Sequence, residues 1–137
     1  ARALRPLVEM LTEPHDNDRY AAIIYALGAL RDPRARDPLV GLLTDRLADP
    51  HVRGFAAEAL AHLPSGDRIV DTLIAQLIDP AAEVRYWCAF ALGQQGALKA
   101  IPALEQLAAQ DTTMLAKRGT VRQEALDAIE QIQSGYR

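Results

Sequence analysis

A short segment of sequence returns four times along the chain, and its successive copies start 33, 32 and 37 residues apart. Small and aliphatic residues keep their places from copy to copy: Ala91-Leu92-Gly93 corresponds to Ala59-Leu60-Ala61 and to Ala26-Leu27-Gly28. A period in this range is typical of solenoid proteins, whose units are too small to bury an apolar face alone and therefore stack on one another. The four copies begin at Tyr20, Arg53, Arg85 and Arg122.

Each unit is predicted to contain two helices. Leucine, isoleucine and valine recur at helical spacing on both sides of a chain-breaking acidic–proline pair, such as Asp49-Pro50 or Asp79-Pro80. Half of the residues are apolar but only 5% are aromatic, which favours closely packed alanine- and leucine-rich helices over a sheet. We therefore predict an all-α solenoid of about four two-helix repeats in a single domain over residues 1–137. The expected units are 3–31, 35–63, 67–95 and 99–133.

Glycine and proline predict where the second helices end, because both are enriched just past a helix terminus. Candidate ends are Gly28, 64–66, 93–96 and Gly135. The fourth unit contains a longer irregular segment, 112–119, which we expect to be a loop between its two helices. Thr120 then lies at capping-box spacing from Gln123 and predicts that a helix restarts there.

The segment from Asp79-Pro80 through Gly93 resembles the HEAT-like repeat family, in particular the short bacterial type related to phycobilin lyase subunits. The resemblance extends over nearly the whole chain. It implies that the second helices line a concave surface, and that an arginine of each second helix meets an acidic residue in a neighbouring inter-helix turn. Unit one departs from the pattern, with Tyr20 in place of the arginine. The implied ladder joins Arg53, Arg85 and Arg122 with Asp49, Asp79 and Asp111.

The second helices also carry six of the seven aromatic residues. At about 100° per residue, Val84, Cys88 and Leu92 share the core side of their helix, whereas Tyr86 and Phe90 point away from it. Exposed aromatic residues are common anchors for partners. We therefore predict an aromatic groove with an acidic rim. Its candidate residues are Tyr25, Phe55, Glu58, Tyr86, Trp87, Phe90, Glu124 and Asp127.

Alternatives stay open for several of these aromatic side chains. Phe55 and Trp87 lie on the flank of their helices, where a side chain can instead be wedged between repeats. Tyr86 and Phe90 could contact further repeats or a second copy of the chain. The apolar first helix, with Leu4, Leu7, Val8, Met10 and Leu11, raises the expectation of self-association through unit one.

Three functions compete. The first is a protein-interaction scaffold that binds a peptide or protein partner, preferably a basic one, on its concave face. The second, implied by the resemblance, is a bilin lyase or bilin-handling subunit that works with a second HEAT-like subunit and stacks its aromatics on a tetrapyrrole. The third, recognition of nucleic acid, is disfavoured because the net charge is −3 and the expected groove is acidic. Arg31, Lys117 and Arg118 lie in loops and are interpreted as solvated charge.

Nothing in the sequence predicts catalysis, so we expect no enzyme, no metal and no cofactor. Cys88 falls at a core position, and His15, His51 and His62 lack the close spacing of metal ligands. The HEAT-like di-iron deoxyhypusine hydroxylases carry His-Glu pairs just after the second-helix arginine. Here those places hold Gly54-Phe55, Tyr86-Trp87 and Gln123-Glu124. A single cysteine, the lack of a membrane-length apolar run and the lack of a signal peptide lead us to expect a cytoplasmic protein.

Overall fold

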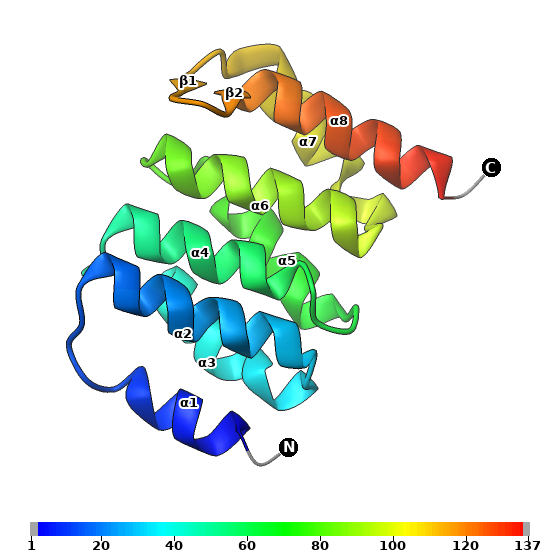
Figure 1. Ribbon diagram of the computed structural model, residues 1–137. Coiled ribbons are helices and arrows are strands. Elements are labelled where there is room, and N and C mark those ends of the chain that lie inside the picture. Colours follow the sequence, from blue (N-terminus) through cyan, green and yellow to red (C-terminus); the bar gives the residue numbers. More distant parts are fainter. Residues whose placement is uncertain (1–2, 136–137) are drawn as a thin grey trace.

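The computed structural model describes residues 3–135 and is built almost entirely of helices (Figure 1). Short 3-10 segments η1 (Pro33–Ala35) and η3 (Leu98–Ala100) lead into α3 and α7, and η2 (Gln76–Ile78) follows α5. The α-helices are α1 (Leu4–Met10), α2 (Asn17–Leu30), α3 (Arg36–Thr44), α4 (Pro50–Leu60), α5 (Asp67–Ala75), α6 (Ala82–Gln95), α7 (Ile101–Gln110) and α8 (Val121–Ser134).

The helices form two stacked layers. In Figure 1 the second helices α2, α4, α6 and α8 lie side by side in chain order at the front, while α3, α5 and α7 lie behind them. Each second helix packs on the first helix of its own unit and on the second helices next to it. This arrangement confirms the predicted all-α solenoid of about four two-helix repeats. At the N-terminal end, α1 buries Leu4 and packs Leu7 and Val8 partly against the core, and self-association through this helix stays a prediction.

The predicted turn residues act as helix caps. Asp49 Oδ1 accepts a hydrogen bond from the backbone N–H of His51 at 2.8 Å, and Pro50 opens α4. Thr120 Oγ1 accepts one from the backbone N–H of Gln123 at 3.0 Å, so α8 begins where the capping-box spacing predicted. Only half of the capping box forms, since the Gln123 side chain donates to Asp127 instead, at 2.9 Å.

Two of the predicted ends of second helices were wrong. Helix α4 ends at Leu60, before the predicted 64–66. Helix α2 continues past Gly28 to Leu30 and ends at Arg31, whose backbone is left-handed with φ 53°. Segment 112–119 lies between the two helices of unit four, as predicted, and within it Met114–Leu115 (β1) and Gly119–Thr120 (β2) pair as an antiparallel hairpin. Its turn is made possible by left-handed residues, among them Gly119 at φ 103°. We refer to residues 114–120 as the hairpin.

Gly28 serves the packing of second helices rather than a helix end. A Cβ atom at Gly28 would lie 3.2 Å from the Cα atom of Ala59 in α4. A Cβ atom at Gly93 in α6 would lie 3.0 Å from the Cα atom of Ala128 in α8. Small residues at these points allow neighbouring second helices to approach until their backbones almost touch, and this explains the alanine- and glycine-rich repeat.

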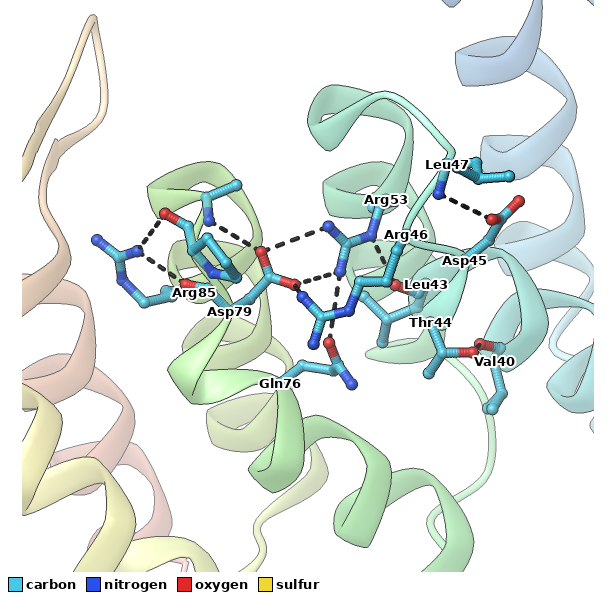
Figure 2. Close-up of polar contacts among 12 residues, drawn as sticks. Val40, Leu43, Thr44, Asp45, Arg46, Leu47, Arg53, Gln76, Asp79 and Arg85 are labelled. Atoms are coloured by element: carbon cyan, nitrogen blue, oxygen red, sulfur yellow. Dashed lines mark hydrogen bonds and ion pairs between the residues drawn. The ribbon is translucent and has the colours of Figure 1, made fainter.

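Arginine–aspartate pairs link consecutive units (Figure 2). Arg53 in α4 is buried and donates to the buried carboxylate of Asp79, which belongs to the turn of the next unit. Arg85 in α6 repeats the pattern one unit on, with its Nε atom 2.6 Å from Asp111 Oδ2. Two of the three arginines in the ladder that the resemblance implied, Arg53 and Arg85, therefore pair with an aspartate of the next unit. The third, Arg122, donates to backbone carbonyl groups instead.

The same arginines also satisfy the carbonyl groups where the first helix of their own unit ends. Arg53 Nε donates to the Leu43 carbonyl oxygen at 2.9 Å, as Figure 2 shows. Arg122 in α8 donates to the carbonyl oxygens of Ala108 and Ala109 at 2.6 and 3.1 Å. The guanidinium group thus ties the two helices of one unit together while it reaches the next.

Unit one replaces its rung with weaker contacts. Tyr20, at the arginine position, donates its hydroxyl to the Glu13 carbonyl oxygen at 3.2 Å. Asp49, which receives no arginine, is hydrogen-bonded by His51 and by the side chain of Asn17 from α2. This hydrogen bond between units one and two therefore joins an uncharged amide to a partly exposed carboxylate, in place of a buried ion pair.

Burial and pairing act in opposite directions on the Asp79 carboxylate. Burial raises the pKa of Asp79, but hydrogen bonds from Arg53 and from the backbone N–H of Ala81 outweigh it and hold the pKa below its usual range. A carboxyl group whose pKa is depressed by folding stabilises the fold above its unfolded pKa, near 3.9. That contribution is lost as the pH falls through the lower, folded value.

Replacing Asp79 by alanine tests the ladder. Because Arg53 would be left buried without its partner, we expect Asp79→Ala to lower the free energy of unfolding by about 3–5 kcal/mol at pH 7. Urea unfolding between pH 7 and pH 2 should also show a smaller loss of stability below about pH 4 than the native chain shows. Asp37→Ala is the matched control, since Asp37 pairs with Arg36 at the surface, where water screens the pair, and its removal should cost much less stability than that of Asp79. Equal losses in the two variants would contradict the assignment.

Gly93→Ala tests the close approach of α6 and α8. The added methyl group meets the backbone of Ala128, so we expect a loss of about 1–3 kcal/mol in the free energy of unfolding. The control is Gly41→Ala in α3, where a Cβ atom meets nothing within 4 Å. There the higher helix propensity of alanine should stabilise the protein by about 0.5–1 kcal/mol. Thermal unfolding of both variants measures the contrast, and a Gly93→Ala protein as stable as the native chain would refute the packing argument.

Candidate functional site

The eight residues predicted for the aromatic groove fall into two places on the layer of second helices. Tyr25, Phe55 and Glu58 line a groove between α2 and α4. The other five, Tyr86, Trp87, Phe90, Glu124 and Asp127, belong to α6 and α8. The structure therefore divides the single groove expected from the sequence into an open part and a largely filled part.

The open part, which we call the α2–α4 groove, has a volume of about 490 Å³. Its floor includes Gly28 and Ala59, the pair whose small side chains bring α2 and α4 together. Tyr25 stands on one wall with 76% of its surface exposed, and Phe55 is half-buried on the other. An exposed tyrosine beside a half-buried phenylalanine is the arrangement of an aromatic anchor site.

Two polar side chains at one end of the groove were not predicted from the sequence as part of the site. Arg31 and His62 both line it, together with the half-buried Glu58. His62 lies four residues after Glu58, just past the end of α4. Residues four apart lie on the same side of a helix, so this spacing could have indicated that His62 also lines the groove. Arg31 was interpreted as solvated charge, but the extension of α2 past Gly28 brings it to the groove.

The aromatic residues of α6 pack on one another instead of standing free. Trp87 makes edge-to-face contacts with Tyr86 and Phe90, with ring centroids 5.2 and 5.4 Å apart. A Cβ atom at Gly54 would lie only 2.8 Å from Trp87 Cδ1, so the indole ring is wedged against α4. Its Nε1 atom donates to Glu83 Oε1 at 3.3 Å. Wedging between repeats, one of the two alternatives for Trp87, is what the structure shows.

Tyr86 is not the exposed side chain that its helical position suggested. Only 8% of its surface is exposed, because α8 packs beside α6 and its hydroxyl forms a hydrogen bond with Glu124. The helical projection considered a single helix and could not include this neighbour. Phe90 remains half-buried.

Two carboxylates of α8 stand beside this cluster. Burial raises the pKa of Glu124 above its usual range, while the hydrogen bond with Tyr86 acts in the opposite direction and Asp127 adds to the rise. Burial also raises the pKa of Tyr86, and Glu124 adds to that shift. Asp127 is exposed. Of the three residues predicted for the acidic rim, Glu124 and Asp127 therefore lie near the Tyr86 hydroxyl, whereas Glu58 lines the α2–α4 groove.

Arg118, a residue of the hairpin, adds a cation to the aromatic cluster of α6. The guanidinium carbon of this hairpin residue lies 4.7 Å from the centroid of the Trp87 ring, within the range of a cation–π interaction. The sequence analysis assigned Arg118 to solvent, and no local pattern connects it with Trp87. The contact depends on how the hairpin folds back toward α6.

Other reactive groups are accounted for by packing. Cys88 is fully buried, as its core position predicted, and burial raises the pKa of its thiol. Within residues 3–135, no three side chains of His, Cys, Asp or Glu gather in a way that could hold a metal ion. None of the helices in this described part of the chain combines the length and the apolar character needed to cross a membrane.

Family models identify the class of this protein. The model for HEAT repeats matches residues 4–69, and the model for the PBS lyase HEAT-like repeat matches residues 84–110. The chain belongs to the HEAT-like repeat family, with repeats related to those of phycobilin lyases.

Curated relatives and a solved structure extend this result. The chain is 39% identical over 70 residues to deoxyhypusine hydroxylase of Rattus norvegicus, a match that covers 51% of this chain and 23% of the relative. It is 33% identical over 88 residues to the Drosophila melanogaster enzyme of that name, covering 62% of this chain and 29% of the relative. It also resembles a chain in the complex of CpcE and CpcF of phycocyanin lyase from Nostoc sp. PCC7120. That likeness has a TM-score of 0.73 and 26% identity, and covers 93% of this chain and 52% of the other.

These relatives correct one expectation. The sequence analysis expected no enzyme, but the curated relatives are named as a hydroxylase and the solved neighbour belongs to a lyase. His-Glu pairs are missing at the positions after Arg53, Arg85 and Arg122. Because the match spans less than a third of the curated relatives, groups outside it can supply their chemistry.

Proposed function

We propose that the chain binds a protein partner on the face formed by its second helices, with the α2–α4 groove as the main contact. The observation that carries this proposal is Tyr25, a large aromatic side chain that is 76% exposed at the edge of an open groove. Leaving such a side chain in water without a partner is unfavourable, whereas tyrosine in a partner's pocket is a frequent source of binding energy.

The shape of the groove suits an extended or helical segment of a partner. The groove runs between two neighbouring helices, and its floor of glycine and alanine gives room for inserted side chains. Within the groove Arg31 offsets the charge of Glu58, so the preference for basic residues on the partner comes from Glu124 and Asp127 farther along the same layer. The complex of two subunits in which the solved neighbour was found supports a protein as the partner.

The first prediction of this proposal concerns Tyr25. We expect Tyr25→Ser to weaken binding of a short amphipathic leucine–arginine peptide by about 5-fold or more, since anchor residues typically contribute over 1 kcal/mol. The fold should be unchanged because the side chain is exposed. Isothermal titration with this peptide, and with a leucine–glutamate peptide of equal length, gives the affinities. Leu47→Ser is the control, since Leu47 is 96% exposed in the turn before α4, away from the groove. Equal weakening in both variants, or none, would contradict the proposal.

A second candidate function is favoured by the solved neighbour. The likeness to a phycocyanin lyase chain covers nearly all of this chain, so we consider a subunit that handles a bilin together with a second HEAT-like subunit. In this case the aromatic residues Tyr25 and Phe55 would stack on the open-chain tetrapyrrole within the α2–α4 groove.

Visible absorbance distinguishes the two candidates. If the second is correct, adding phycocyanobilin should shift its absorption band, because a bound tetrapyrrole is held in fewer conformations than a free one. The shift should be reduced in Tyr25→Ser and retained in Leu47→Ser. A spectrum identical to that of free bilin, with the native chain in excess, would rule out this function and leave the protein partner.

A further inference from the structure

The cation–π contact between Arg118 and Trp87 joins the tip of the hairpin to α6, whose Arg85 also holds the residues that lead into the hairpin, Asp111 and Thr113. Trp87 is 5% exposed, and it is enclosed by Tyr86, by Phe90 and by the α4 backbone at Gly54. Arg118 lies over its ring, while the arginine itself is exposed to solvent. The hairpin therefore places a cation on an aromatic surface that is already held rigid by its neighbours.

Little else holds this arginine in place. Within residues 3–135 its side chain makes no hydrogen bond or ion pair, and its backbone N–H donates to the Leu115 carbonyl oxygen inside the hairpin. A cation–π contact at an exposed site is weak, so a competing cation can displace Arg118 at little cost. The hairpin has strands of only two residues each, which favours such a movement.

The carboxylates near the Trp87–Tyr86 pair outnumber the single positive charge of Arg118. Glu83 accepts a hydrogen bond from Trp87, while Glu124 and Asp127 lie near the Tyr86 hydroxyl. One carboxylate thus lies at the indole N–H of Trp87 and two lie near the hydroxyl of the adjoining Tyr86, while a single guanidinium group covers the indole ring. This combination of aromatic face and carboxylates is suited to bind arginine, whose flat guanidinium stacks on rings and pairs with carboxylates.

We propose that the Trp87 surface is a binding site for an arginine side chain of the protein partner, and that Arg118 occupies this site within the free chain. The hairpin then acts as a latch, which the arginine of the partner displaces from Trp87. This inference rests on the proposed function and specifies its partner: a segment that presents arginine to the second-helix face beyond the α2–α4 groove.

The protein provides its own reporter, since Trp87 is the only tryptophan in the chain. The first experiment measures quenching of its fluorescence by acrylamide in Arg118→Gln and in the control Lys117→Gln. Both variants lose one positive charge of the hairpin turn, but only Arg118 covers the ring. We expect faster quenching in Arg118→Gln than in the native chain and no change in Lys117→Gln. Quenching that is the same in all three proteins would overturn the latch, whatever the outcome at Tyr25.

The second experiment titrates the same proteins with a hexa-arginine peptide and follows Trp87 emission. Because the peptide no longer competes with Arg118, we expect it to bind Arg118→Gln roughly two- to five-fold more tightly than the native chain. Lys117→Gln should show no such gain. Equal gains in affinity in the two variants would mean that the peptide responds to the net charge of the protein and would overturn the proposal. No gain in either variant would show that arginine does not bind at Trp87. If Tyr25→Ser loses binding of the leucine–arginine peptide but still binds hexa-arginine at Trp87, the two sites act independently and the arginine site is supported.

Discussion

The buried guanidinium group of Arg53 is the element on which the stacking of units depends. One side chain closes the end of α3 through the Leu43 carbonyl oxygen and reaches the buried carboxylate of Asp79 in the following unit. An arginine is expensive to bury, and it is tolerated here because its donors meet a carbonyl and a carboxylate. The ion pair therefore sets the position of one unit on the next, while the apolar contacts around it supply most of the stabilisation.

The small residues of the second helices determine where the molecule can bind something. Helices α2 and α4 can approach closely because residue 28 is a glycine. Gly28 and Ala59 form the floor of the α2–α4 groove, and their small side chains leave the space above them open. Farther along, the large side chains of α6 fill the corresponding space and are covered by the hairpin. A single repeating scaffold thus carries one open surface and one covered surface, according to the size of a few side chains.

Much of this organisation could be predicted from the sequence, because the features concerned are local or periodic. Helix pairs follow from apolar spacing, and the Thr120 cap from its distance to Gln123. The forward pairing of Arg53 and Arg85 follows from a family pattern that depends on the same period. What could not be predicted involves neighbours remote in sequence. Tyr86 is buried by α8, and Arg118 reaches Trp87 through the backbone path of the hairpin. No regular spacing of residues in the sequence indicates either contact.

The missing rung in unit one has a mechanical consequence. A solenoid transmits tension from unit to unit, so its interfaces are loaded in series and the weakest yields first. Arg53 and Arg85 reinforce the two later interfaces with charge, whereas Asp49 is joined to unit one by the neutral side chain of Asn17. Under a stretching force, or in thermal fluctuations, α1 and α2 should detach as a pair before the other units separate. Since α2 forms one wall of the α2–α4 groove, this weak interface would let that wall move while the rest of the stack stays rigid.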